Sequence, residues 1–149
     1  MDGMRIVDAA RGWIGTRFHH QGRVKRCDAH RGGVDCLGLL IGVAGELHLT
    51  LDGKPFASFD DTTYSHYPDT EHLKSQLLKV LCPTDNKDLL PGDVVLLNVD
   101  SRPQHLAIVS TCHEGLGIIH AYAPARSVVE HHLDDWWLER IVSVFRIKS

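Results

Sequence analysis

The most apolar stretch of the chain reads DCLGLLIGVAGE, residues 35–46. Its apolar run, Cys36 to Gly45, has ten residues and falls well short of the roughly 20 needed to span a bilayer. The run is apolar on nearly every side, which is typical of a helix buried in a core. Gly38 and Gly42 lie one helical turn apart and permit close packing. The sequence therefore predicts a buried central helix over about residues 35–48.

Before this helix the chain is predicted to form an amphipathic helix followed by a long loop. From Met4 to Ile14 the apolar residues recur at steps of three and four, which predicts an amphipathic helix that Gly12 and Gly15 bring to an end. Residues 15–34 show little periodicity and are expected to form a long loop toward the central helix. The pair Gly32-Gly33 in this loop permits a tight approach of the backbone.

The segments after the central helix change from a helical to a strand period. Residues 49–69 are polar and are expected to form a loop that holds part of a substrate groove. Thr70–Leu81 is predicted as a second amphipathic helix, which Pro83 prevents from continuing. Five short strands are predicted beyond it, namely Val94–Leu97, His105–Thr111, Leu116–Ala121, Ser127–Glu130 and Ile141–Ile147. N-terminal helices packed on an antiparallel meander of about five strands make the expected fold α+β.

Length and composition limit the class of protein. With 149 residues, 43% of them hydrophobic, the chain is expected to form a single domain over residues 1–149. A formal net charge of −3 argues against nucleic acid and against attraction to an anionic membrane, and no membrane insertion is expected. The N-terminus shows no basic segment followed by a long apolar run, so cytoplasmic synthesis without a signal peptide is expected.

Cys36 is the candidate nucleophile among the four cysteines. The cysteines at positions 27, 36, 82 and 112 lack the two-residue spacing of zinc ligand pairs and redox dithiols, so reduced thiols are expected. Cys36 falls in the first turn of the predicted helix, where free N–H groups and the helix dipole favour a thiolate. The alternative is that Cys36 is only a small buried apolar residue.

Two histidines on predicted strands could serve a cysteine nucleophile as its base and as the group that orients the base. If His105 and His120 face one another, the connection must be a six-residue loop over residues 110–115, with Val109 opposite Leu116, or a bulged equivalent. A tight turn at Glu114-Gly115 would instead place His120 opposite Val109, about 13 Å along the strand from His105. We predict the longer connection, which brings the two histidines opposite one another. The alternative is that His105 and His120 are ordinary half-buried side chains with no catalytic role.

In order along the chain, these motifs resemble the NlpC-type cell-wall cysteine peptidases, a papain-like family. The matching segments are Ala10–Thr16, Gly33–Leu39, Leu90–Val95, His105–Val109 and Ile119–Ala121. The segments His20–Arg23 and Tyr64–Asp69 look more like the branch found among bacteriophage tail-associated peptidases. Phage or prophage origin, phage tail proteins as partners and action at the cell wall are what this branch implies.

The resemblance implies a role for each candidate residue. Cys36 would be the nucleophile, His105 the general base and His120 the residue that orients it. The family usually cleaves peptidoglycan stem peptides near a γ-D-glutamyl to diamino-acid linkage, and no cofactor is implied. Two positions depart from the family pattern, because Leu37 stands where a serine is common and Phe18 where a tyrosine is frequent. His20 or backbone N–H groups could replace the missing hydroxyl.

Other polar residues are candidates for substrate binding. Asp35 is expected to be the N-cap of the central helix, the alternative being a role in aligning a substrate amine. Arg23 and Arg31 could hold a substrate carboxylate in a bidentate manner. No metal site is expected, because the paired histidines at 19–20 and 131–132 would point to opposite faces of a strand.

Two functions compete with the peptidase. One is a non-catalytic tail or assembly component that keeps the fold and uses its groove or an exposed Trp136-Trp137 surface for protein contacts. The other is an amidase or acyltransferase that uses the same thiol on another substrate. The simplest structure for Asp134–Trp137 is a turn followed by aromatic packing against the core.

Overall fold

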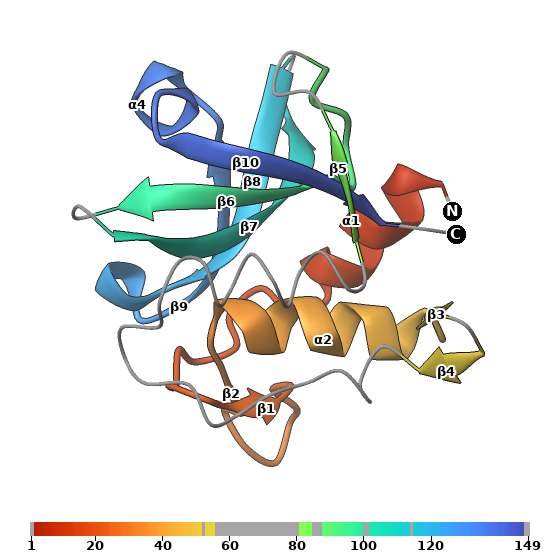
Figure 1. Ribbon diagram of the computed structural model, residues 1–149. Coiled ribbons are helices and arrows are strands. Elements are labelled where there is room, and N and C mark those ends of the chain that lie inside the picture. The colour runs from red at the N-terminus through yellow and green to blue at the C-terminus, as the bar shows by residue number, and fades with distance from the viewer. Residues whose placement is uncertain are drawn as a thin grey trace.

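The protein is built on a six-stranded antiparallel sheet, with helices α1 and α2 packed against one of its faces (Figure 1). The computed structural model describes residues 2–51, 53–55, 81–84, 88–99, 102–113 and 115–147. The elements of these residues are α1 (Gly3–Arg11), β1 (Arg23–Val24), β2 (Gly33–Val34), α2 (Cys36–Glu46), β3 (Thr50–Leu51), β4 (Lys54–Pro55), β5 (Leu81–Thr84), β6 (Val94–Val99), β7 (Arg102–Cys112), β8 (Gly115–Tyr122), η2 (Ala123–Ala125), β9 (Ser127–His132), α4 (Asp135–Leu138) and β10 (Ile141–Ile147).

The predicted α+β class is confirmed, and the sheet is larger than predicted by one strand. Its order is β5-β10-β6-β7-β8-β9, so the predicted meander runs from β6 to β9 and β10 returns to pair with β6. The sixth strand, β5, begins at Leu81, the last residue of the helix predicted over 70–81. The rest of that helix, and the loop after β4, lie outside the described residues. Pro83 lies opposite Phe145 on this edge strand, where a missing N–H costs no pairing within the sheet.

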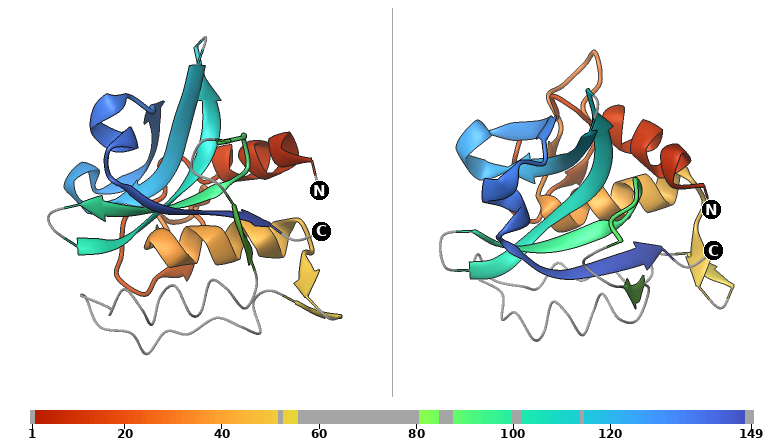
Figure 2. Two further views of the ribbon diagram at one scale, coloured as in Figure 1. Left: turned by 45° about the horizontal axis from the view of Figure 1, so that its top comes forward. Right: turned by 90° about the horizontal axis from the view of Figure 1, so that it is seen from above.

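The core has two layers, one on each face of the sheet. Buried side chains of α1 and α2 pack on alternate residues of the central strands, among them Leu106, Ile108 and Ile119. The opposite face carries Ala107, Val109 and Ile118, which are covered by Trp137 of α4 and its neighbours. In Figure 2, α4 lies across the sheet from α2. Burial on both faces explains why the strands read as continuous apolar runs as well as alternating ones.

The central helix is confirmed as α2, and glycines determine how closely it packs. A Cβ added at Gly42 would lie 2.3 Å from the Trp13 ring, and one added at Gly38 would lie 2.2 Å from the carbonyl oxygen of Gly22. The close contacts are thus to Trp13 and the 15–34 loop rather than to the sheet. Gly32 has φ +66°, and an added Cβ would lie 2.5 Å from a backbone oxygen, as the predicted tight approach requires. No helix of the described residues is long and apolar enough to cross a membrane.

We expect opposite effects from two alanine substitutions in α2. Gly45→Ala meets no atom within 4 Å and should raise the free energy of unfolding by up to about 1 kcal/mol, because alanine favours the helix. Gly42→Ala should lower it by about 1–3 kcal/mol, because the new methyl group collides with buried Trp13. Urea unfolding of both variants measures the difference; stabilisation by Gly42→Ala would contradict the close packing.

Candidate active site

Asp35 fixes the start of α2, where Cys36 is the first helical residue. One carboxylate oxygen accepts hydrogen bonds from the Gly38 N–H at 2.8 Å and from Arg23 Nη1 at 3.0 Å. The other accepts the Gln21 N–H at 2.9 Å. The N-cap prediction for Asp35 is therefore confirmed, and the same carboxylate also joins the 15–34 loop to the helix.

Cys36 lies where α2 meets the middle of the sheet, against the backbone of Leu106 in β7. Burial raises the pKa of its thiol to about 12, and the negative charge of Asp35 raises it further. The backbone N–H groups of Leu106, Leu37 and Cys36 itself act in the opposite direction. Burial therefore works against the thiolate expected at the helix start, because desolvation outweighs the backbone dipoles.

His105 and His120 are in direct contact, although the predicted strand register is wrong. Nε2 of His105 lies 2.6 Å from Nδ1 of His120, at hydrogen-bond distance. Cys112 at the end of β7 pairs with Gly115 at the start of β8, which excludes the six-residue loop over 110–115, and Val109 pairs with Ile118. Continued past its last pair, Ile108 with Ile119, this register places Ala107 opposite His120. The two histidines are thus diagonal neighbours on one face, close enough for long side chains to meet.

His131 on β9 continues this contact, and the sequence analysis missed it. Its Nε2 lies 2.8 Å from Nε2 of His120, and its Nδ1 lies 3.0 Å from the carbonyl oxygen of His132. Ile118 pairs with His131 and His120 with Val129, so His131 is also a diagonal neighbour of His120. The strand predicted over Ser127–Glu130 ends one residue before His131, whereas β9 extends to His132, so a longer predicted strand could have identified it.

The environment of His105 and His120 favours neutral rings. Burial lowers the pKa of His105 to about 4. Burial also lowers the pKa of His120, and the neighbouring rings of His105 and His131 add to this effect. Trp137 packs on this group, with its ring centre 5.1 Å from that of His120 and 5.0 Å from that of His131. A neutral His105, next in sequence to the Leu106 backbone that Cys36 contacts, is chemically suited to act as a general base.

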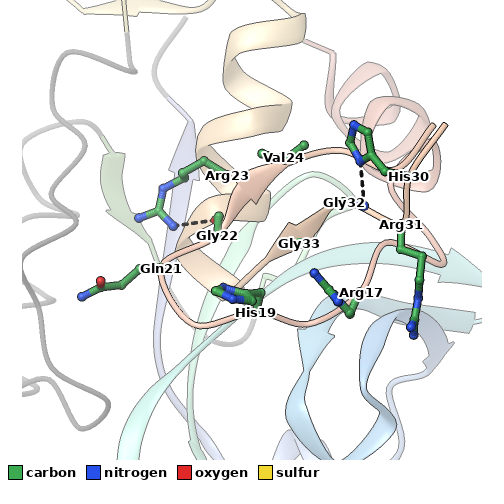
Figure 3. A pocket seen from close by; sticks show the side chains of 10 residues that line it. All are labelled: Arg17, His19, Gln21, Gly22, Arg23, Val24, His30, Arg31, Gly32 and Gly33. Atoms are coloured by element: carbon green, nitrogen blue, oxygen red, sulfur yellow. Dashed lines mark hydrogen bonds between the residues drawn. The ribbon is translucent and has the colours of Figure 1, made fainter.

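A hollow of about 740 Å³ opens beside the start of α2 (Figure 3). Its charged and titratable lining is entirely basic, consisting of Arg17, His19, Arg23, His30 and Arg31. Arg17 and Arg31 lie toward one end of the hollow and Arg23 toward the other (Figure 3). The two predicted carboxylate-binding arginines thus line one hollow, but Arg23 Nη1 is already bonded to Asp35 and to the Gly22 carbonyl oxygen.

The remaining sequence-predicted residues have other positions. His20 lies in the loop beside His19, whose Nδ1 contacts the His20 carbonyl oxygen, and it is not among the residues that line the hollow. Leu37 and Phe18, the two departures from the family pattern, pack against the core. Trp136 is 46% exposed, with the Arg140 guanidinium 3.5 Å above its ring, whereas Trp137 is buried.

None of the four cysteines forms a disulfide, and Cys27 and Cys82 are exposed. His105, His120 and His131 form a chain rather than converging on one point. Within the part of the chain that the structure describes, no group of three His, Cys, Asp or Glu residues could hold a metal ion. The chemistry that the arrangement offers is nucleophilic attack by a thiol, with an imidazole to take up and return its proton.

Comparison with known proteins gives matches among solved structures. No protein-family model matches the chain, and no curated protein matches it. The NlpC/p60 domain of the peptidoglycan hydrolase SagA aligns over 99% of this chain and 100% of its own, with 18% identity and a TM-score of 0.60. An NlpC/p60 family protein from Bacillus cereus aligns over 99% of this chain, with 15% identity and a TM-score of 0.65, but the match spans only 40% of that protein.

An N-acetylmuramoyl-L-alanine amidase from Bacteroides uniformis aligns over 99% of both chains, with 13% identity and a TM-score of 0.55. At such low identities the likeness concerns the architecture. The chain has the fold of NlpC/p60 domains.

Proposed function

We propose that residues 1–149 act as one catalytic domain, a cysteine peptidase that hydrolyses peptidoglycan stem peptides. The observation that carries the proposal is the sequence of contacts at the start of α2. Cys36 lies against the backbone of Leu106, and the preceding residue, His105, is bonded to His120. A thiol, a base and a residue that holds the base are the parts needed for acyl transfer. The NlpC/p60 fold supports cell-wall peptide as the substrate.

The mechanism starts from a neutral thiol and a neutral imidazole. His105 takes the proton of the Cys36 thiol as sulfur attacks the peptide carbonyl carbon. The Cys36 backbone N–H at the helix start helps to stabilise the resulting oxyanion. The His105 imidazolium then protonates the leaving amine as the carbon–nitrogen bond breaks, which leaves an acyl-enzyme. Water, deprotonated by His105, releases the acyl group and regenerates the thiol.

The basic hollow supports an acidic substrate. Stem peptides carry free carboxylates at D-glutamate and at the diamino acid, and arginine binds carboxylates with two parallel hydrogen bonds. Gly22 and Arg23, which line the hollow, also contact the first turn of α2 at Gly38. The hollow therefore adjoins the first turn of the helix that begins at Cys36. This supports γ-D-glutamyl-diamino-acid endopeptidase activity, with Asp35 and Arg23 shaping the binding side and His20 close to it in sequence.

Two finer assignments belong to the same proposal. The resemblance of His20–Arg23 to tail-associated peptidases supports a phage or prophage origin, with delivery to the cell wall by tail proteins. The Bacteroides amidase favours a second candidate, cleavage between muramic acid and L-alanine, because it shares the fold over its whole length. The amidase would leave sugar chains without any peptide, whereas the endopeptidase would leave L-alanyl-D-glutamate attached to them.

We expect Cys36→Ala to abolish hydrolysis of purified peptidoglycan, with a loss of about 1,000-fold or more in kcat, because it removes the thiol that forms the acyl-enzyme in the proposed mechanism. Mass spectrometry of the digest identifies the bond from the new peptide termini. Cys82→Ala is the matched control, since Cys82 is an exposed thiol on β5, and it should digest like the wild type. Equal digestion by Cys36→Ala would refute the proposal.

The lowered pKa of His105 predicts activity in mild acid. A base with a pKa of about 4 stays neutral until the pH falls to that range, so kcat/KM should decline there rather than at the ordinary histidine value of about 6.5. The raised pKa of Cys36 predicts no thiolate at neutral pH. The difference in ultraviolet thiolate absorbance between wild type and Cys36→Ser measures whether Cys36 is ionised. A thiolate signal at neutral pH would contradict a neutral Cys36 thiol beside a neutral His105.

Arg31→Gln should raise KM for stem peptide by up to roughly tenfold with little change in kcat, because it removes a charged donor from the hollow but leaves Cys36 untouched. Steady-state kinetics on a soluble muropeptide measure both constants. Arg5→Gln, on the exposed side of α1, is the control for loss of one positive charge. An unchanged KM in Arg31→Gln would place the substrate carboxylate outside the hollow.

A further inference from the structure

We infer that His131 is a positioning residue: the backbone carbonyl of His132 sets its proton, and through it the protons of His120 and His105. The inference rests on the proposed function and extends it. Three imidazoles on three successive strands, β7, β8 and β9, are joined by contacts of 2.6 and 2.8 Å. The chain ends at the carbonyl oxygen of His132, 3.0 Å from Nδ1 of His131.

The last group in the chain determines the direction of every hydrogen bond. A carbonyl oxygen can only accept, so Nδ1 of His131 carries the proton, and Nε2 of the neutral His131 ring is an acceptor. Nε2 of His120 must then donate to it, which leaves Nδ1 of His120 as an acceptor. Nε2 of His105 in turn donates to Nδ1 of His120.

The result at His105 is a ring with its proton on Nε2 and its lone pair on Nδ1. Nδ1 is then the atom that can receive the Cys36 thiol proton, since Nε2 is already occupied. If His120 carried its proton on Nδ1 instead, two donors would face each other at the His105 contact unless His105 also changed. The wrong tautomer of the base places its lone pair away from the nucleophile.

The rings are also held against rotation. His120 is 0% exposed, and a flip of its ring would replace both bonded nitrogens with carbons. Tyr122 stacks on His120 with ring centres 4.9 Å apart. Trp137 packs edge-on against the same His120 ring. Trp137 also contacts His131, so one buried indole supports the middle and last rings of the chain.

The chain orients His105 and does not carry its proton away. The proton of the thiol passes to Nδ1 of His105 and later to the leaving amine, while Nε2 keeps its own proton throughout. His120 and His131 remain neutral, because a terminal carbonyl oxygen cannot accept a proton in exchange. His131 thus acts through His120 and touches neither Cys36 nor substrate in this scheme.

The first test is direct and requires no activity. Long-range proton–nitrogen NMR correlation of the wild-type histidine rings at neutral pH distinguishes protonated from bare ring nitrogens, with each ring assigned by its own His→Gln variant. We expect His105 and His120 to carry the proton on Nε2 and His131 on Nδ1. A proton on Nδ1 of His120 in the wild type would overturn the inference.

The second test compares three variants on muropeptide. His131→Phe keeps an aromatic ring against Trp137 but removes the acceptor, so kcat should fall roughly tenfold or more with KM nearly unchanged. His131→Gln supplies a side-chain oxygen that can accept from His120, and kcat should largely recover. His132→Gln is the control, because it alters an exposed side chain and keeps the carbonyl.

Equal kcat values for His131→Phe and His132→Gln would overturn the inference, as would a loss that His131→Gln does not restore. Failure of the proposed function gives a different result, namely a wild type that cleaves no muropeptide. In that case the NMR comparison of wild type with His131→Phe still decides. Retention of the Nε2 proton on His120 in both proteins would show that His131 does not set it.

Discussion

The carboxylate of Asp35 is the constraint from which the site is built. It accepts the N–H of Gly38, which caps α2, and it also binds the N–H of Gln21 and the guanidinium of Arg23. The loop that lines the basic hollow is thereby attached to the same helix start that presents Cys36. The attachment is close because Gly38 has no side chain to keep the Gly22 carbonyl away. One buried acid therefore determines the relative position of Cys36 and the basic hollow, and any other residue at position 35 would have to replace three hydrogen bonds.

This arrangement has an electrostatic cost at the nucleophile. The charge of Asp35 raises the pKa of the Cys36 thiol, in the same direction as burial, and backbone N–H groups only partly oppose it. Arg23 neutralises the carboxylate but does so from the loop side. On the sheet side, burial lowers the pKa of His105, so neither member of the pair is charged at rest. In the proposed mechanism the proton therefore moves during the attack, because separated charges would be expensive where both groups are desolvated.

The sequence predicts much of this architecture where the signal is local. The helical period of residues 4–14, the apolar run after Asp35 and the two-residue period after Pro91 correspond to α1, α2 and five of the six strands. Cys36, His105 and His120 were selected by helix position and strand pattern. β5 escaped notice because Leu81-Cys82-Pro83-Thr84 has no clear alternation, and its strand conformation depends on pairing with the distant β10. The register of β7 with β8 was missed because the turn places His113 at φ +56°, a conformation more typical of Asn or Gly than of His.

The chemical type of the group that bonds to His120 also affects the electrostatics of the site. A carboxylate next to His120 would add a negative charge, favour an imidazolium and raise the histidine pKa values. A neutral imidazole that ends on a backbone carbonyl supplies the same hydrogen bond without any charge. The formal charges of Asp35 and Arg23 consequently lie on the loop side of Cys36, whereas the chain His105–His120–His131 ends on the carbonyl oxygen of His132. Direct cross-strand pairing could not reveal this chain, because both of its contacts join diagonal neighbours, and only the twisted sheet brings those rings together.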